Sequence, residues 1–274
     1  LMHPERGHRA ANSAAQIAMF EWGSRHASAS VFGVLHGTRP GMTEMAAAQL
    51  LRYAGQPMTM HPIVTTGKGE MNGLRSPTAK IIEQGDAISV AVGYWGSLVC
   101  RAGMLLAEPD EPFFKNTVAP YFGAQATWYQ TMRIGATGGE IFAAVSRAFG
   151  DSGLRSSLNP GHLGSFEEWL HSPIRPDSTE QIRSGMVFQV DIIPTPLPAG
   201  YTLNCEDTVA VADQALRSEI RGSYPAMWAR IEARRQFMAE ALGIRLADEI
   251  LPLTDGPAYL PPFWLAPELV CVVE

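Results

Sequence analysis

The segment SGMVFQVD, residues 184–191, places an apolar run between a glycine and an aspartate, and the segment NCEDTVAV, residues 204–211, carries a second apolar run. Short apolar runs bounded by turn residues are typical of buried strands. The strand predicted at Met186–Asp191 ends on a carboxylate and continues into Ile192 and Ile193. A buried carboxylate is costly unless a hydrogen bond, a cation or a metal ion compensates it. Asp191 is therefore a candidate site residue.

The same order of landmarks occurs earlier in the chain. Gly85 precedes a strand predicted at 86–91, as Gly185 precedes the strand just described. Upstream of each strand, Thr43 and Thr137 stand where a threonine side chain can cap a helix. A repeated helix-then-strand unit predicts an internal duplication that relates about 36–101 to 132–211. A chance match is the alternative, because a glycine before a strand and a threonine before a helix are both common.

The remaining elements follow from apolar periodicity and from turn residues. Helices are predicted, in chain order, at Glu5–Ala27, Glu44–Tyr53, Gly139–Phe149 and Pro225–Leu242. Strands are predicted at residues 61–66 and 87–92, and a short strand at Leu269–Val273 ends a tail that contains several prolines. We interpret residues 1–274 as one domain of the α/β (α+β) class, with a leading helix within residues 1–29.

Composition and charge exclude several classes of function. Hydrophobic residues make up 46% of the 274 residues and charged residues 18%, which is typical of a chain with a packed core. A net charge of −6 without a basic stripe argues against nucleic acid as a partner. No apolar run approaches the ~18 residues of a membrane helix, so we expect no membrane partner. Three widely spaced cysteines favour a cytoplasmic location. Because the first residue is Leu1, we expect a fragment that an N-terminal domain could precede.

Three motifs in the second part of the chain carry a resemblance to a known family. They are PGHLG at 160–164 and the two segments quoted above, and RPGMTE at 39–44 with Gly85-Asp86 adds the first part. In this order they resemble the pita-bread domain of methionine aminopeptidases, aminopeptidase P, prolidase and creatinase. The resemblance implies two pseudo-symmetric helix–strand halves around a curved, mostly antiparallel sheet, and a homodimer. It spans nearly the whole chain.

The family's chemistry implies a dinuclear metal centre, in which two divalent ions activate a water. Matched residue by residue, His162 corresponds to the histidine ligand, Asp191 to the first acidic ligand of the second half, and Glu206 to the last. The two aspartates of the first half are missing, because Ala91 and Leu98 stand at their positions. Neither side chain can bind a hard cation. We therefore expect no dinuclear centre and no cofactor, with one divalent ion (Mn, Co, Zn or Fe) on the three remaining residues as the alternative.

Three further residues are candidates for binding substrate. Arg101 follows the position of the second missing aspartate, and a structural ion pair with the site acids is its alternative role. His171 is the nearest candidate for the family's second histidine, although Trp169 is closer to the expected register. Arg75 occupies the stretch where many relatives carry a histidine before Asn-Pro.

The sequence leaves three functions open. The first is a metal-independent hydrolase that resembles creatinase and acts on a C–N bond of a small peptide or amidino compound, with His162 as the proton shuttle and Asp191 and Glu206 orienting the substrate cation. The second is an Xaa-Pro aminopeptidase with one metal ion on His162, Asp191 and Glu206. The third is a catalytically inactive module that binds a peptide or a protein. A hydrolase with a small-molecule or peptide substrate is the leading hypothesis.

Overall fold

Strand pairing organises the molecule around one antiparallel sheet. The computed structural model describes residues 3–68, 75–167 and 169–273. Within them the sheet has seven strands, in the order β1-β2-β3-β8-β6-β5 with β9 paired to β8. A separate two-stranded sheet joins β4 to β7. The strand bounds are β1 Ile63–Gly67, β2 Ala87–Tyr94, β3 Ser97–Met104, β4 Arg155–Ser156, β5 His162–Leu163, β6 Val187–Val190, β7 Pro194–Thr195, β8 Asn204–Val211 and β9 Ile250–Pro252.

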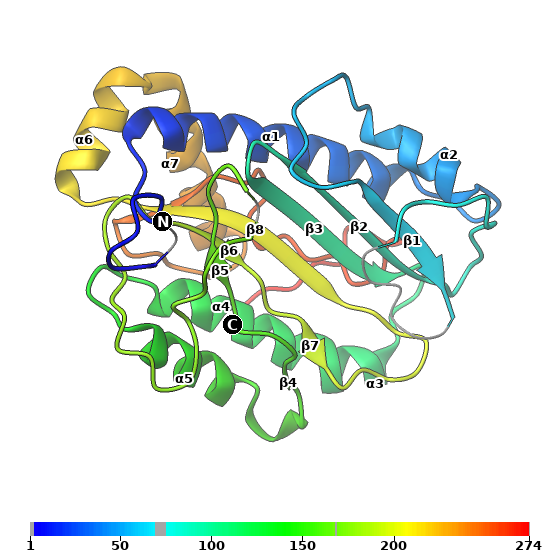
Figure 1. Cartoon of the computed structure of the whole chain (residues 1–274). Coiled ribbons are helices and arrows are strands. Elements are labelled where there is room, and N and C mark those ends of the chain that lie inside the picture. Colours follow the sequence, from blue (N-terminus) through cyan, green and yellow to red (C-terminus); the bar gives the residue numbers. More distant parts are fainter. Residues whose placement is uncertain (1–2, 69–74, 168, 274) are drawn as a thin grey trace.

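Helices surround this sheet, with α1 and α2 above it in Figure 1 and α4 and α5 below it. The helix bounds are α1 Ala14–Gly37, α2 Glu44–Ala48, α3 Glu111–Phe113, α4 Ala119–Thr131, α5 Gly138–Ala148, α6 Gln214–Ser223 and α7 Pro225–Glu240. Short 3₁₀ turns follow α2 and α5, and a π-helical turn joins α3 to α4. In the described part of the chain, no helix has both the length and the apolar character that crossing a membrane requires.

The leading helix starts later and runs further than the sequence predicted, from Ala14 to Gly37 instead of from Glu5 to Ala27. Ser13 sets the start, because it forms a capping box with Gln16 that satisfies amides of the first turn. The extension past Ala27 packs closely on the sheet. A side chain at Gly23 would lie 2.3 Å from the carbonyl oxygen of Tyr94, so only glycine allows this approach.

Matching hydrogen bonds bear out the predicted duplication. The amide of Gly41 donates to the carbonyl of Ile82 at 2.9 Å, and the amide of Gly135 donates to that of Ile182 at 2.9 Å. We call residues 36–105 the first half and residues 132–211 the second half. Thr43 caps α2 and Thr137 caps α5, as the sequence predicted, although α2 ends at Ala48 and not near Tyr53.

The strands of the two halves begin in the same way. Gly85 and Gly185 both have a positive φ, +84° and +85°, which favours glycine. The amide of Gly85 donates to Leu105 at 2.9 Å, and the amide of Gly185 donates to Val211 at 2.7 Å. The segments at 86–91 and 186–191, which each follow one of these glycines, are therefore counterparts, and the halves meet where β3 pairs with β8.

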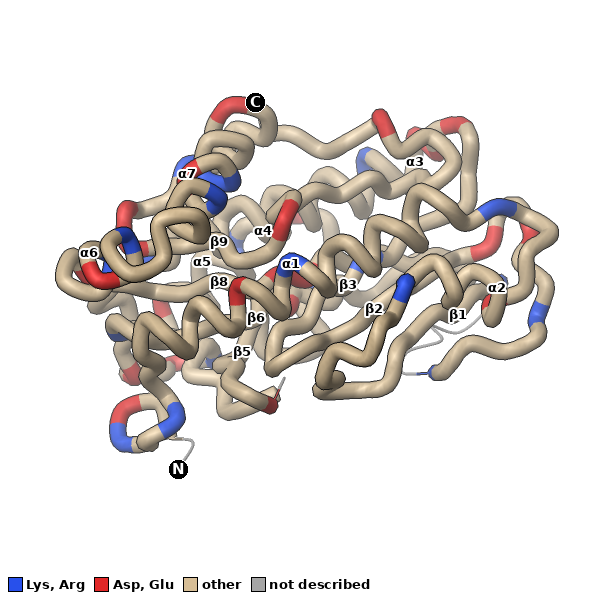
Figure 2. The backbone as a smooth tube through the Cα atoms, turned by 90° about the horizontal axis from the view of Figure 1, so that it is seen from above, with Lys and Arg blue, Asp and Glu red and all other residues tan. Residues whose placement is uncertain are grey.

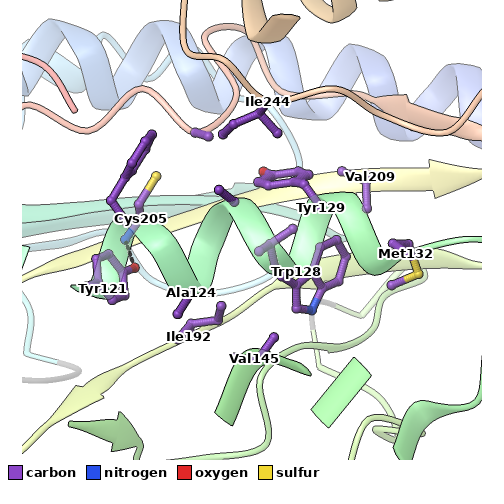
Figure 3. Packing of buried hydrophobic residues seen from close by; sticks show 14 of the residues in the cluster. Tyr121, Ala124, Trp128, Tyr129, Met132, Val145, Ile192, Cys205, Val209 and Ile244 are labelled. Atoms are coloured by element: carbon purple, nitrogen blue, oxygen red, sulfur yellow. Dashed lines mark hydrogen bonds between the residues drawn. The ribbon is translucent and has the colours of Figure 1, made fainter. Parts of the chain in front are cut away.

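Helix α4 fills the largest core cluster and was not predicted from the sequence (Figure 3). Most of its side chains are buried, including Tyr121, Trp128 and Tyr129, so it lacks the polar stripe that identifies a surface helix. The indole of Trp128 donates to the carbonyl of Pro160 at 2.7 Å. This bond ties α4 to the segment that leads into His162.

The C-terminal part closes the molecule through helix α7 and the tail. Figure 2 shows basic and acidic residues interspersed along the chain, with several of both on α6 and α7. Glu21 on α1 pairs with Arg230 and Arg234 on α7, each at 2.7 Å, and Arg234 also reaches Asp255 in the tail. The strand predicted at Leu269–Val273 is wrong, because this segment makes isolated hydrogen bonds to loops and no ladder. The tail instead contributes β9.

Candidate functional site

A cavity of about 360 Å³ lies at the junction of the two halves, and we call it the central cavity. Seven of its described lining residues come from the first half: Met60, His61, Ile63, Ser89, Ala91, Leu98 and Cys100. Seven come from the second half: Leu158, His162, Trp169, Asp191, Ile193, Asn204 and Glu206. The set contains His162, Asp191 and Glu206, and it also contains Ala91 and Leu98, where the resemblance places the missing aspartates.

Strand register explains why these residues meet. Ile63 pairs with Ala91 across β1 and β2, Ala91 pairs with Cys100 across β2 and β3, and Cys100 pairs with Glu206 across β3 and β8. Residues directly opposite one another in an antiparallel sheet point to the same face. One row of side chains therefore crosses four strands and passes from an apolar end to a carboxylate.

His162 enters the cavity from β5, where it pairs with Gln189 of β6. Gly161 before it has φ +107°, and a side chain there would lie 2.9 Å from the carbonyl oxygen of Gln189. The Nδ1 of His162 lies 3.0 Å from the carbonyl oxygen of Leu163, so Nδ1 is the donor. The Nε2 then faces Asp191, whose Oδ2 is 3.9 Å away. This arrangement can stabilise a proton on Nε2.

Glu206 is held by Asn204, whose Nδ2 donates to Oε1 at 2.5 Å. The Oδ1 of Asn204 in turn accepts from the hydroxyl of Tyr121 on α4 at 3.3 Å. Burial and the charge of Glu206 raise the pKa of the Cys100 thiol well above its usual range. Cys100 therefore stays protonated near neutral pH and is not a nucleophile.

The donor set of the central cavity does not fit a dinuclear metal centre. Ala91 and Leu98 line the cavity with hydrocarbon only, so two of the five side chains that the resemblance requires have no ligand atom. In the described part of the chain, no group of three or more His, Cys, Asp or Glu side chains is arranged to hold a metal ion. No step of the chemistry below therefore uses a pair of metal ions.

Arg101 does not reach the cavity, which corrects its expected role in substrate binding. Neighbouring residues on a strand point to opposite faces, so Arg101 lies opposite Cys100. It is fully buried, and its Nη2 pairs with Asp207 at 2.8 Å. Burial lowers the pKa of Arg101, but the charge and the hydrogen bond of Asp207 together with the neighbouring Cys205 and Tyr129 raise it, so the net shift of the pKa is upward. The ion pair expected as its alternative role exists, but with Asp207 and not with the acids of the cavity.

His171 and Arg75 also lie outside the residues that line the cavity. The Nε2 of His171 is 3.4 Å from Glu180, and its ring stacks on that of His3. Arg75 is exposed, and its Nη2 donates to the hydroxyl of Thr65 at 3.3 Å. Trp169 takes the place expected for His171, with its ring centroid 6.3 Å from that of His162. The signal in the sequence was that Trp169 lies closer than His171 to the register expected for the family's second histidine.

Sequence reasoning missed His61, Ser89 and Asn204, which also line the cavity. Asn204 stands within a quoted motif, so its place two residues before Glu206 on one strand was a usable signal. His61 precedes Pro62 just before β1, and no motif surrounds it. Only the tertiary structure brings it to the second half.

The sequence matches no protein-family model and no curated protein. Solved structures do match. A Xaa-Pro dipeptidase from Bacillus anthracis has a TM-score of 0.66 at 18% identity, covering 92% of this chain and 64% of that one. A prolidase from Pyrococcus horikoshii has a TM-score of 0.64 at 18% identity, covering 74% and 61%. A histidine-to-alanine variant of aminopeptidase P from Escherichia coli has a TM-score of 0.65 at 15% identity, covering 80% and 60%.

These matches confirm the pita-bread fold that the motifs indicated. The chain spans 60% to 64% of the length of these three proteins, in the manner of their C-terminal domain. At this level of identity the likeness establishes the fold alone. Activity has to be argued from the residues of the cavity.

Proposed function

We propose that this chain is a hydrolase that cleaves a C–N bond of a small peptide or amidino compound in the central cavity, without a pair of metal ions. One observation carries the proposal. The cavity is lined by His162, Asp191 and Glu206, whereas Ala91 and Leu98 line it where the resemblance places the two aspartates. Groups suited to acid–base catalysis are thus present where ligands for two metal ions are not. The peptidase neighbours support a hydrolytic role.

His162 is the proton carrier in this proposal. Its Nε2 takes a proton from a water as the water oxygen bonds to the substrate carbon, and it then gives that proton to the nitrogen as the C–N bond breaks. Asp191, 3.9 Å from Nε2, stabilises the imidazolium between these two steps. Glu206, held by Asn204, orients a cationic group of the substrate.

The test compares two histidines of this chain. Purified protein is assayed with Xaa-Pro dipeptides and with guanidino acids, in the presence of a chelator. His162→Gln should lower kcat by about 10²- to 10⁴-fold, because it removes the proton carrier. His171→Gln is the matched control, since His171 also faces a carboxylate but lies outside the cavity lining. It should retain full activity. Equal losses in the two variants, or full activity of His162→Gln, would contradict the proposal.

Metal content and binding separate the other candidates. Elemental analysis that finds two equivalents of Mn, Co, Zn or Fe per chain would defeat the proposal. One equivalent, with activity lost in chelator, would favour the Xaa-Pro aminopeptidase with one ion on His162, Asp191 and Glu206. A module that binds a peptide without turnover is favoured by one observation, the 67% exposure of the Trp169 side chain beside the cavity. Peptide binding without any turnover would support that module.

A further inference from the structure

The two walls of the central cavity differ in chemistry. The first-half wall is mainly apolar, because Ile63, Ala91, Leu98 and Cys100 pack into a cluster of their own with Met60 against it, and His61 and Ser89 are its polar members. This cluster is separate from the three larger clusters of the core. The second-half wall carries His162, Asp191 and Glu206.

The apolar wall faces the cavity and not the helices. On the same strands, Val64, Val90 and Val99 belong to the cluster that includes α1 residues, so the two faces of β1, β2 and β3 have different partners. When a ligand displaces water from apolar surface that lines a cavity, the free energy of the complex is lowered. The part of a ligand that suits this wall is therefore apolar.

The opposite wall favours positive charge. The described residues that line the cavity include two carboxylates, Asp191 and Glu206, and no lysine or arginine. Arg101, which follows the lining residue Cys100 on β3, points to the other face of that strand and is paired with Asp207. Partly buried carboxylates attract a cation more strongly than carboxylates in bulk water do.

We propose that the central cavity binds an amphipathic cation, a primary amine or amidine that carries an apolar group. The apolar group lies against Ile63, Ala91 and Leu98, and the cation lies between Asp191 and Glu206. The volume of about 360 Å³ suits one small ligand of this kind. This inference uses the cavity of the proposed function and names its ligand class, and it does not require turnover.

The test is a calorimetric titration of the whole chain with alkylammonium ions at pH 8, where free imidazole is mostly uncharged. The probes are n-butylammonium, n-hexylammonium and n-octylammonium, with n-hexanoate as the probe of opposite charge. Affinity should rise by up to about fourfold for each added methylene until the apolar wall is covered. Hexanoate should bind much more weakly than hexylammonium. Equal binding of these two ions, or no dependence on chain length, would overturn the proposal.

Variants separate the two walls. Leu98→Asn should flatten the dependence on chain length, because it makes the apolar wall polar, and Leu269→Asn at an exposed site should not. Asp191→Asn should weaken binding of all three ammonium ions by about tenfold and keep the chain-length dependence, since one charge is lost. An unchanged dependence in folded Leu98→Asn would overturn the apolar wall. If Leu98→Asn does not fold, the wild-type titrations with the three ammonium ions and with hexanoate still test the proposal. Binding as expected without any turnover would defeat the proposed function and leave this inference intact.

Discussion

The two halves of the molecule share a framework and differ in the side chains that they send into the central cavity. Each half begins with a threonine-capped helix and enters its strand through a glycine of positive φ. The first half then contributes Ala91 and Leu98 to the cavity, and the second half contributes Asp191 and Glu206. The framework depends on backbone hydrogen bonds and turns, so it persists when the cavity residues change from charged to apolar.

A second difference lies where the halves meet. At the β3–β8 pair, Cys100 and Glu206 face the cavity, whereas Arg101 and Asp207 form an ion pair buried in the core. Adjacent residues therefore have opposite roles. The buried pair joins the halves, and the cavity pair is open to a ligand. Three predictions address these comparisons.

Arg101→Ala should have the largest effect, a loss of about 3–5 kcal/mol of unfolding free energy. The change leaves the fully buried carboxylate of Asp207 without its cation. Chemical denaturation of both proteins measures the difference. Arg75→Ala is the control in the same half, because Arg75 is exposed, and it should stay within about 0.5 kcal/mol of wild type. Similar midpoints for both variants would show that the buried pair does not join the halves.

Glu44→Gln should have an intermediate effect of about 1–3 kcal/mol. The carboxylate of Glu44 is 2% exposed and accepts hydrogen bonds from the amides of Thr66 and Thr78, at 2.7 and 2.9 Å. Burial raises the pKa of Glu44, and the hydrogen bonds from Thr78 and Thr66 outweigh it, so the net shift is downward.

Because the pKa of Glu44 is lowered in the folded state, its contribution to stability should change with pH in a direction that can be tested. Its contribution is present above the ordinary glutamate pKa, about 4.3, and is lost as pH falls through the lower folded value. Wild type should therefore lose stability on acidification more steeply than Glu44→Gln in this window. Glu140, which caps α5 in the other half, is exposed, and Glu140→Gln should cost less than Glu44→Gln. A larger loss of stability in Glu140→Gln than in Glu44→Gln would contradict the stabilising role of the buried hydrogen bonds that Glu44 accepts from Thr66 and Thr78.

The smallest expected difference in stability is the one between the alanine variants of the paired glycines, Gly85 and Gly185. Gly85→Ala should cost about 1–2 kcal/mol, because alanine is strained at positive φ. Gly185→Ala should cost more, because its side chain would lie 3.0 Å from the backbone oxygen of Asn12, whereas the nearest atom at Gly85 is a lysine side chain 3.9 Å away. Thermal unfolding of the two variants measures the difference. A larger loss in Gly85→Ala would show that the leading segment does not constrain the second half.

Much of the fold could be predicted because its signals are local. Threonine caps, glycine turns and short apolar runs located α5, β2, β6 and the start of α2 to within a few residues. Helix α4 was missed because it is buried on most sides, and a helix with apolar residues around its whole circumference lacks amphipathic periodicity. The strand expected at Leu269–Val273 failed because a run of apolar residues becomes a strand only where a neighbouring edge is available for pairing.

The sequence by itself indicated the duplication, and its resemblance to the pita-bread family implied the fold and the positions of His162, Asp191, Glu206, Ala91 and Leu98 in the site. Motif order and glycine positions carry this information, because they reflect backbone constraints that do not depend on distant contacts. Only the tertiary structure decided which polar residues share the cavity. Strand alternation turned Arg101 into the core and packing placed His171 beside Glu180, whereas His61 and Trp169 reach the cavity lining from loops outside the strands. Side-chain direction on a strand is settled by the pairing of strands far apart in the chain, and no single segment encodes it.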